Sequence, residues 1–225
     1  MKELNKKAFG GLLRLFATIA ALLFLPAWTL DYWQAWIFLL AFFAPVLGIT
    51  LYLMKNDPAL LERRVDAGPG AEKERVQRII QTLAAIAFVV VIVFPAFDRR
   101  FGWSTVPAWA AAAGDFLVAL GLVFVFVVFK ENTYASGAIE VGADQKVIST
   151  GPYKLVRHPM YAGAIVMLLG VPVVLGSWWG LLAVVPITLV IVWRLIDEER
   201  FLAQNLPGYS EYRNKVKYRL VPLVW

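Results

Sequence analysis

Four apolar runs in the chain are each long enough to cross a lipid bilayer. They cover residues 8–29, 33–54, 78–97 and 107–129, and about 20 mostly apolar residues suffice to cross a hydrocarbon core of roughly 30 Å. The first run follows three lysines and ends in LPAWTLD, without a small-residue cleavage site. We therefore expect a retained membrane helix here and not a cleaved signal peptide.

A fifth apolar block, 160–196, is interrupted at LGSWWG, residues 175–180. Each half holds roughly 16–18 residues, which is short for a spanning helix that rises about 1.5 Å per residue. The block therefore predicts a tight helical hairpin. Taken together, the pattern predicts an all-α integral membrane protein with about five membrane elements: four spanning helices and a C-terminal helical hairpin.

Composition agrees with a chain that resides in a bilayer. Hydrophobic residues make up 60% of the sequence, charged residues only 17%, and the mean hydropathy is +0.66. A soluble domain of this length needs more polar residues to cover its surface. The chain has no cysteine, which excludes disulfides and thiolate metal sites, and a single histidine, so we expect no metal site.

The basic residues are distributed unevenly about the apolar runs. If the N-terminus is cytoplasmic, 20 of the 22 Lys and Arg residues lie on the cytoplasmic side, and only Arg99 and Arg100 lie outside. This is a strong positive-inside bias. The net charge of +6 then follows from membrane orientation, and no nucleic-acid partner is expected. We expect an inner-membrane protein with both termini and its active site on the cytoplasmic side.

Tryptophans give a second, independent indication of topology. In this orientation the loops near 30–32, 98–106 and 176–179 face outward. The tryptophans that flank these loops form the expected outer aromatic belt: Trp28, Trp33, Trp36, Trp103, Trp109, Trp178 and Trp179. Chemistry then belongs on the other side, where the polar segment 130–160 and the basic, tyrosine-rich C-terminal tail flank the hairpin.

The segment GPYKLVRHPMYAG, residues 151–163, contains His158, the only histidine of the chain. Pro159 suits a first helical position because it lacks an N–H, which makes His158 the expected helix cap. The free N–H groups that follow favour an anion, and Arg157 adds a full positive charge. Tyr153 and Tyr161 add aromatic rings, so the corner suits a ligand with a carboxylate and a flat ring. Simple anchoring at the membrane interface is the alternative.

A second polar motif, WRLIDEERF, ends the hairpin at residues 193–201. Arg194 and Glu198 are four residues apart, so they share a helix face and can pair. Charged groups at the end of an apolar helix are often functional. For Arg194 two interpretations remain open: it has a functional role, or the helix has left the membrane at this point and Arg194 is solvated. We expect Asp197 and Glu199 to belong to a solvated face.

In combination, these motifs resemble a known enzyme family. The order is Gly-Pro-Tyr-x-x-x-Arg-His-Pro-x-Tyr, a membrane hairpin, Arg-x-x-x-Glu-Glu and Gly-x-x-x-Tyr, over roughly residues 145–222. It resembles the isoprenylcysteine carboxyl methyltransferases, which are grouped with membrane phospholipid methyltransferases. The resemblance implies methyl transfer from S-adenosylmethionine to a lipophilic acceptor at the cytoplasmic face. It makes 130–225 the methyltransferase region and 1–129 the N-terminal membrane helices.

The resemblance also implies roles for individual residues. Arg194 falls where the family orients the acceptor, and Glu198 where it contacts the cofactor; we take both as the catalytic pair. A carboxylate acceptor needs no base, whereas an amine acceptor would need Glu198 or Glu199. The implied cofactor contacts are Gln145, Lys146, Val147, Ile148, Tyr153, His158, Pro159, Met160, Tyr161 and Glu198.

Two other classes of function remain as alternatives. Some membrane-embedded reductases share a similar C-terminal hairpin, although more helices and a nicotinamide site would be expected of them. A small transporter is the second alternative, and Asp115 within an apolar run is its main support. The chain lacks the repeated halves that such transporters often show. Membrane lipids and a lipophilic acceptor are the partners that we expect.

Overall fold

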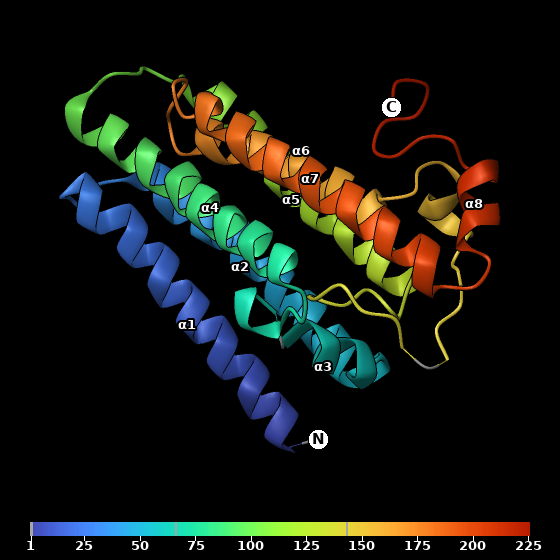
Figure 1. Ribbon diagram of the computed structural model, residues 1–225. Helices are drawn as coiled ribbons and strands as arrows, with labels where there is room; N and C mark the ends of the chain where they lie inside the picture. The colour runs from blue at the N-terminus through green and yellow to red at the C-terminus, as the bar shows by residue number, and fades with distance from the viewer. Residues whose placement is uncertain (1, 66, 143) are drawn as a thin grey trace.

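Four long helices run side by side and agree with the four apolar runs. The computed structural model describes residues 2–65, 67–142 and 144–225, and within these ranges only helices and connecting segments occur (Figure 1). All four helices are long and apolar enough to cross a membrane. They are α1 (Lys2–Ala27), α2 (Trp33–Asn56), α4 (Arg75–Phe101) and α5 (Ala108–Glu131). The predicted class, an all-α integral membrane protein, is confirmed.

The predicted C-terminal hairpin is also present. Its first arm, α6 (Pro159–Val174), is as short as expected, whereas its second arm, α7 (Leu181–Asn205), extends well beyond the apolar residues. The polar connections contain the short elements α3 (Pro58–Val65), η1 (Pro69–Ala71) and η2 (Gly151–Lys154), and α8 (Tyr209–Lys215) lies in the tail. The polar end of α7 therefore projects from the membrane helices toward α8 (Figure 1).

Small residues allow α5 and α6 to pack with their backbones in contact. Gly114 and Gly121 of α5 face Gly170 and Gly163 of α6, in an antiparallel register. A Cβ atom placed on Gly170 would lie 2.3 Å from the carbonyl oxygen of Gly114, and one on Gly121 would lie 2.6 Å from that of Gly163. Such close approach is a main source of helix association in lipid, where burial of apolar surface drives little. The contact fixes the position of α6, whose first turn carries His158.

The loops that were expected to face outward gather at one end of the bundle. Arg99 donates a hydrogen bond to the carbonyl of Asp31 at 3.0 Å, and the indole of Trp178 donates to the carbonyl of Thr105 at 3.2 Å. The buried carboxylate of Asp98 accepts hydrogen bonds from the hydroxyls of Ser104 and Ser177. These contacts tie the hairpin turn to the loop after α4.

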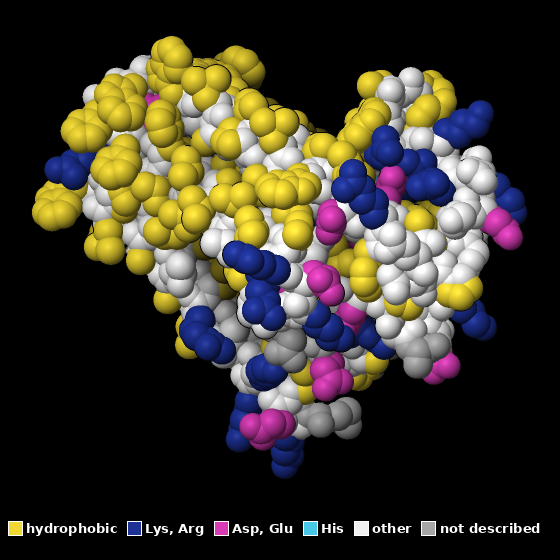
Figure 2. All heavy atoms as spheres, in the orientation of Figure 1, with side chains coloured by type: hydrophobic (Ala, Val, Ile, Leu, Met, Phe, Trp, Pro, Cys, Tyr) yellow, Lys and Arg dark blue, Asp and Glu magenta, His cyan; other side chains and the backbone are white. Residues whose placement is uncertain are grey.

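Charged side chains gather toward the opposite end. Figure 2 shows hydrophobic side chains over the long helices and most Lys, Arg, Asp and Glu side chains around the other end of the molecule. All seven tryptophans of the predicted belt are exposed. This division supports an integral membrane protein, while the assignment of the charged end to the cytoplasm remains a prediction from the positive-inside bias.

Candidate active site

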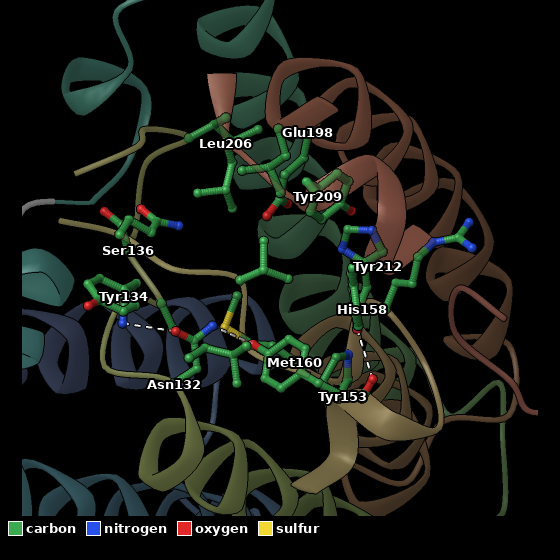
Figure 3. Close-up of a pocket in the computed structure, with 18 of the residues that line it drawn as sticks. Asn132, Tyr134, Ser136, Tyr153, His158, Met160, Glu198, Leu206, Tyr209 and Tyr212 are labelled. Carbon is green, nitrogen blue, oxygen red and sulfur yellow. Dashed lines mark hydrogen bonds between the residues drawn. The ribbon is translucent and has the colours of Figure 1, made fainter. Parts of the chain in front are cut away.

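A pocket lies at the charged end, between the segment after α5, the first turn of α6, the polar end of α7 and α8 (Figure 3). Every residue for which the resemblance implied a role lines this pocket. They are Gln145, Lys146, Val147, Ile148, Tyr153, His158, Pro159, Met160, Tyr161, Arg194 and Glu198. The fold thus brings together residues from separate segments, and their individual roles remain predictions.

Glu199 is buried behind the pocket wall, so its expected place on a solvated face is wrong. Only 4% of the residue is exposed, and its carboxylate accepts hydrogen bonds from Arg157 at 2.6 Å and from Arg219 at 3.1 Å. The His158 ring nitrogen Nε2 lies 3.3 Å away. Burial alone would raise the pKa of Glu199, but the hydrogen bonds from His158 and Arg157 lower it to about 2. Asp197 is not free in water either, because it accepts a hydrogen bond from Gln77.

The C-terminal tail explains why Glu199 is buried. The tail folds back over the start of α6. There the backbone N–H of Arg157 donates to the backbone carbonyl of Tyr218, and the backbone N–H of His158 donates to the backbone carbonyl of Arg219. The side chain of Arg157 also donates to the carbonyls of Val216 and Lys217 at 2.8 and 3.0 Å. The charge of Arg157 is therefore used internally, which corrects its expected role as a free anion-binding charge.

His158 occupies the predicted cap position at the start of α6, but its side chain does not cap the helix. The ring instead faces Glu199 and stacks on Tyr161, with ring centroids 5.7 Å apart. The amides of Met160 and Tyr161 consequently have no capping partner among the described residues. Both residues line the pocket, so the helix end remains available to a ligand.

We expect Glu199→Gln to destabilise the protein by roughly 3 kcal/mol, because it leaves buried cations without their carboxylate. The folded pKa of about 2 lies below the usual 4.5, so the stabilisation is fully present above pH 4.5 and is lost as the pH falls through 2. Thermal unfolding in detergent measures the effect, with the exposed Glu211→Gln as the matched control. Equal melting temperatures for the two variants at pH 7 would contradict the assignment.

Arg194 is buried and held from several sides. Its Nη2 donates to Glu72 at 2.7 Å, and its Nε donates to the Tyr161 hydroxyl at 3.1 Å. That hydroxyl donates in turn to Glu198 at 2.6 Å. Arg194 and Glu198 thus share a face, as predicted, but Tyr161 links them and the ion pair of Arg194 is with Glu72. The interpretation that Arg194 simply emerges into water is excluded by its burial.

The loop before α4 packs against Arg194 and against the segment after α5. Glu72 is 2% exposed, and its second carboxylate oxygen accepts from the backbone N–H of Ile139 at 3.1 Å. Lys73 forms an ion pair with Glu140 at 3.5 Å, and Arg63 donates to the carbonyl of Thr133 at 2.8 Å. Sequence reasoning missed Glu72, because nothing local distinguishes it from the other charges of its loop.

Aromatic residues of the tail also line the pocket without having been assigned a role. The Tyr212 hydroxyl donates to the carbonyl of Tyr153 at 2.8 Å, and Asn132 donates to the Tyr153 hydroxyl at 2.8 Å. Burial raises the pKa of Tyr153 to about 12. The buried hydroxyl of Tyr209 has no hydrogen-bond partner among the described residues.

In Figure 3, Asn132 and Tyr134 lie across the pocket from His158. The abundance of tyrosine in the tail was the only sequence signal for Tyr209 and Tyr212.

The part of the chain that forms this pocket matches a known protein family. Residues 109–207 match the phospholipid methyltransferase family. The matched stretch contains nearly all of α5, the hairpin and most residues that line the pocket. The predicted resemblance to the group of phospholipid and isoprenylcysteine methyltransferases is therefore confirmed over this part of the chain.

One curated relative is similar over a longer part of the chain. The cobalt-zinc-cadmium resistance protein CzcN of Cupriavidus metallidurans is 26% identical over 129 residues. The alignment covers 56% of this chain and 58% of that protein, so the chain spans less than two thirds of the relative. The resistance in its name describes that protein.

Proposed function

We propose that this protein transfers a methyl group from S-adenosylmethionine to a lipophilic acceptor at the cytoplasmic face of the membrane. One observation carries the proposal: residues implied by the methyltransferase resemblance, from four separate segments, line a single pocket at the charged end of the helices. An acceptor in the bilayer and a cofactor in the cytosol can meet only at such an end.

The chemistry of the pocket fits the cofactor. The uncapped amides of Met160 and Tyr161 suit its carboxylate. Glu198 accepts a hydrogen bond only from Tyr161 among the described residues, so one carboxylate oxygen is available for an amino group or ribose hydroxyl. The unpartnered Tyr209 hydroxyl adds a polar group, and the Tyr153 ring adds an aromatic face. His158 would support this end through its stacking on Tyr161.

When bound, S-adenosylmethionine supplies a methyl group on a sulfonium, which is already a good leaving group. The residues of the pocket therefore need to position the reactants more than to move protons, and such positioning can contribute roughly 7–11 kcal/mol. Arg194 and the Tyr161 hydroxyl would fix the acceptor side of the pocket.

The acceptor is proposed to be an isoprenylcysteine-like carboxylate or a lipid head group. A carboxylate needs no base. An amine would need Glu198, because Glu199 is neutralised by Arg157 and Arg219 and its low pKa makes it a poor base.

The proposal is tested by methyl transfer in lipid nanodiscs. We expect tritium from methyl-labelled S-adenosylmethionine to enter the organic phase with N-acetyl-S-farnesylcysteine, a carboxylate acceptor, or with phosphatidylethanolamine, an amine acceptor. An excess of S-adenosylhomocysteine, which should occupy the same pocket, should suppress the transfer. Absence of labelled product with both acceptors, in a preparation that also fails to bind S-adenosylhomocysteine, would refute the proposed function.

A further inference from the structure

Arg64, in the last turn of α3, contacts two residues that line the pocket. Its Nη1 donates to the carbonyl of Ser136 at 3.0 Å and lies 3.9 Å from the sulfur of Met160. Its guanidinium also covers the ring of Phe129, 5.1 Å from the ring centroid. Ser136 and Met160 both line the pocket. The guanidinium therefore lies next to the pocket wall, between α3 and Phe129 of α5.

The positive charge of Arg64 has no counter-charge in the described part of the chain. Its partners are a carbonyl, a thioether and an aromatic ring, and none of them carries a full negative charge. The arginines around it differ, because Arg157 and Arg219 pair with Glu199 and Arg194 pairs with Glu72. A partly buried cation without a carboxylate is costly unless an anion joins it.

The guanidinium of Arg64 also retains unused hydrogen-bond donors. Both of its polar contacts involve Nη1, so Nε and Nη2 have no partner among the described residues. A guanidinium with a free edge matches the two oxygens of a carboxylate or phosphate. Arg194 has fewer donors left for a ligand, because its Nε, Nη1 and Nη2 all make hydrogen bonds within the protein.

The electrostatic environment of Arg64 also favours a bound anion. Burial lowers the pKa of Arg64, and the positive charge of Arg194 lowers it further, while Tyr161 acts in the opposite sense. An anion bound between the two arginines would relieve both the desolvation and the repulsion. The neighbouring Arg63 lacks this setting, because it contacts Thr133 and Tyr134 and does not contact Met160.

We propose that Arg64 binds the acidic group of the methyl acceptor, a phosphate or a carboxylate carried by a lipid chain. The inference rests on the proposed function and assigns the acceptor to anionic amphiphiles. Arg64 lies in the short helix α3, which follows the membrane helix α2, so it lies near that end of α2, where the acidic group of a membrane amphiphile would reside. Arg194 then acts as the positioning residue that holds the Tyr161 hydroxyl beside the acceptor.

Binding of defined amphiphiles to the purified protein in dodecyl maltoside tests this site. Calorimetric titrations with dodecyl phosphate and with laurate distinguish the two acidic groups, and dodecyltrimethylammonium is the cationic control. We expect one or both anions to bind the wild type and Arg64→Gln to weaken that binding about tenfold or more. Arg63→Gln, on the same helix, should change it less than about twofold, because Arg63 contacts Thr133 and Tyr134 and not the pocket residue Met160.

Two further measurements keep the outcomes distinct. Arg64→Lys retains the positive charge but not the planar guanidinium with its paired donors, so it should bind the same anion at least about threefold more weakly than wild type. If Arg64→Gln does not fold, this variant provides the test of the site. S-adenosylhomocysteine should bind Arg64→Gln as it binds the wild type. Unchanged anion affinity in the Arg64 variants, an equal loss in Arg63→Gln, or no anion binding to the wild type would overturn the site. Anion binding through Arg64 without any binding of S-adenosylhomocysteine would instead overturn the proposed function.

Discussion

Arg194→Lys is expected to lower turnover about 100-fold while S-adenosylhomocysteine affinity changes less than about threefold. Lysine can keep the ion pair with buried Glu72, but it cannot simultaneously donate to the Tyr161 hydroxyl as the planar guanidinium does. The loss therefore falls on the orientation of the Tyr161 hydroxyl at the acceptor side of the pocket, while the cofactor contacts stay in place. The measurement is methyl transfer at saturating cofactor, together with calorimetry on the same preparation.

Arg200→Lys is the matched control, because Arg200 is exposed on the same helix, and it should retain wild-type turnover. Arg194→Ala should behave differently from Arg194→Lys. It leaves Glu72 buried and unpaired, so we expect a further loss of about 3–5 kcal/mol of stability. Wild-type turnover in Arg194→Lys, or an equal loss of cofactor affinity and turnover, would contradict the positioning role of Arg194.

Gly170→Ala is expected to destabilise the membrane bundle by about 2–3 kcal/mol. The added Cβ would lie 2.3 Å from the carbonyl oxygen of Gly114, and this backbone atom cannot rotate away. The helices α5 and α6 would have to separate along their closest contact. Because α6 carries His158 and Met160 into the pocket, cofactor affinity should fall as well.

Gly48→Ala provides the control for this substitution. Gly48 lies in α2, and an added Cβ there meets no atom within 4 Å. Alanine also favours a helix more than glycine does, so the control should be neutral or slightly stabilised. Thermal unfolding in detergent compares the two variants. Equal melting temperatures would show that α5 and α6 are not held by backbone contact.

The membrane architecture could be predicted because it depends on local properties of the sequence. The length and hydropathy of each apolar run determine whether it can span a bilayer, and the break at LGSWWG interrupts the fifth block. The structure agrees with this pattern at all four spanning helices and at the hairpin. The excess length of α7 was missed because its last turns are polar and are stabilised by the tail.

The candidate site could be predicted only in part. The segment from Tyr153 to Tyr161 is contiguous, so its motif indicated a site without knowledge of the fold. The burial of Glu199 depends on Arg219, 20 residues later, and the environment of Arg194 depends on Glu72, 122 residues earlier. Such long-range partners have no local signal, and charged residues at a helix end look solvated until the segment that covers them is known.

Calorimetric titration of the purified protein with S-adenosylhomocysteine tests the central claim most directly. We predict single-site binding in the micromolar range for the wild type. Glu198→Gln, which changes a carboxylate that lines the pocket, should bind at least about tenfold more weakly, and the exposed Glu211→Gln should bind like wild type. No binding to the wild type, or equal affinities for wild type and Glu198→Gln, would contradict the account.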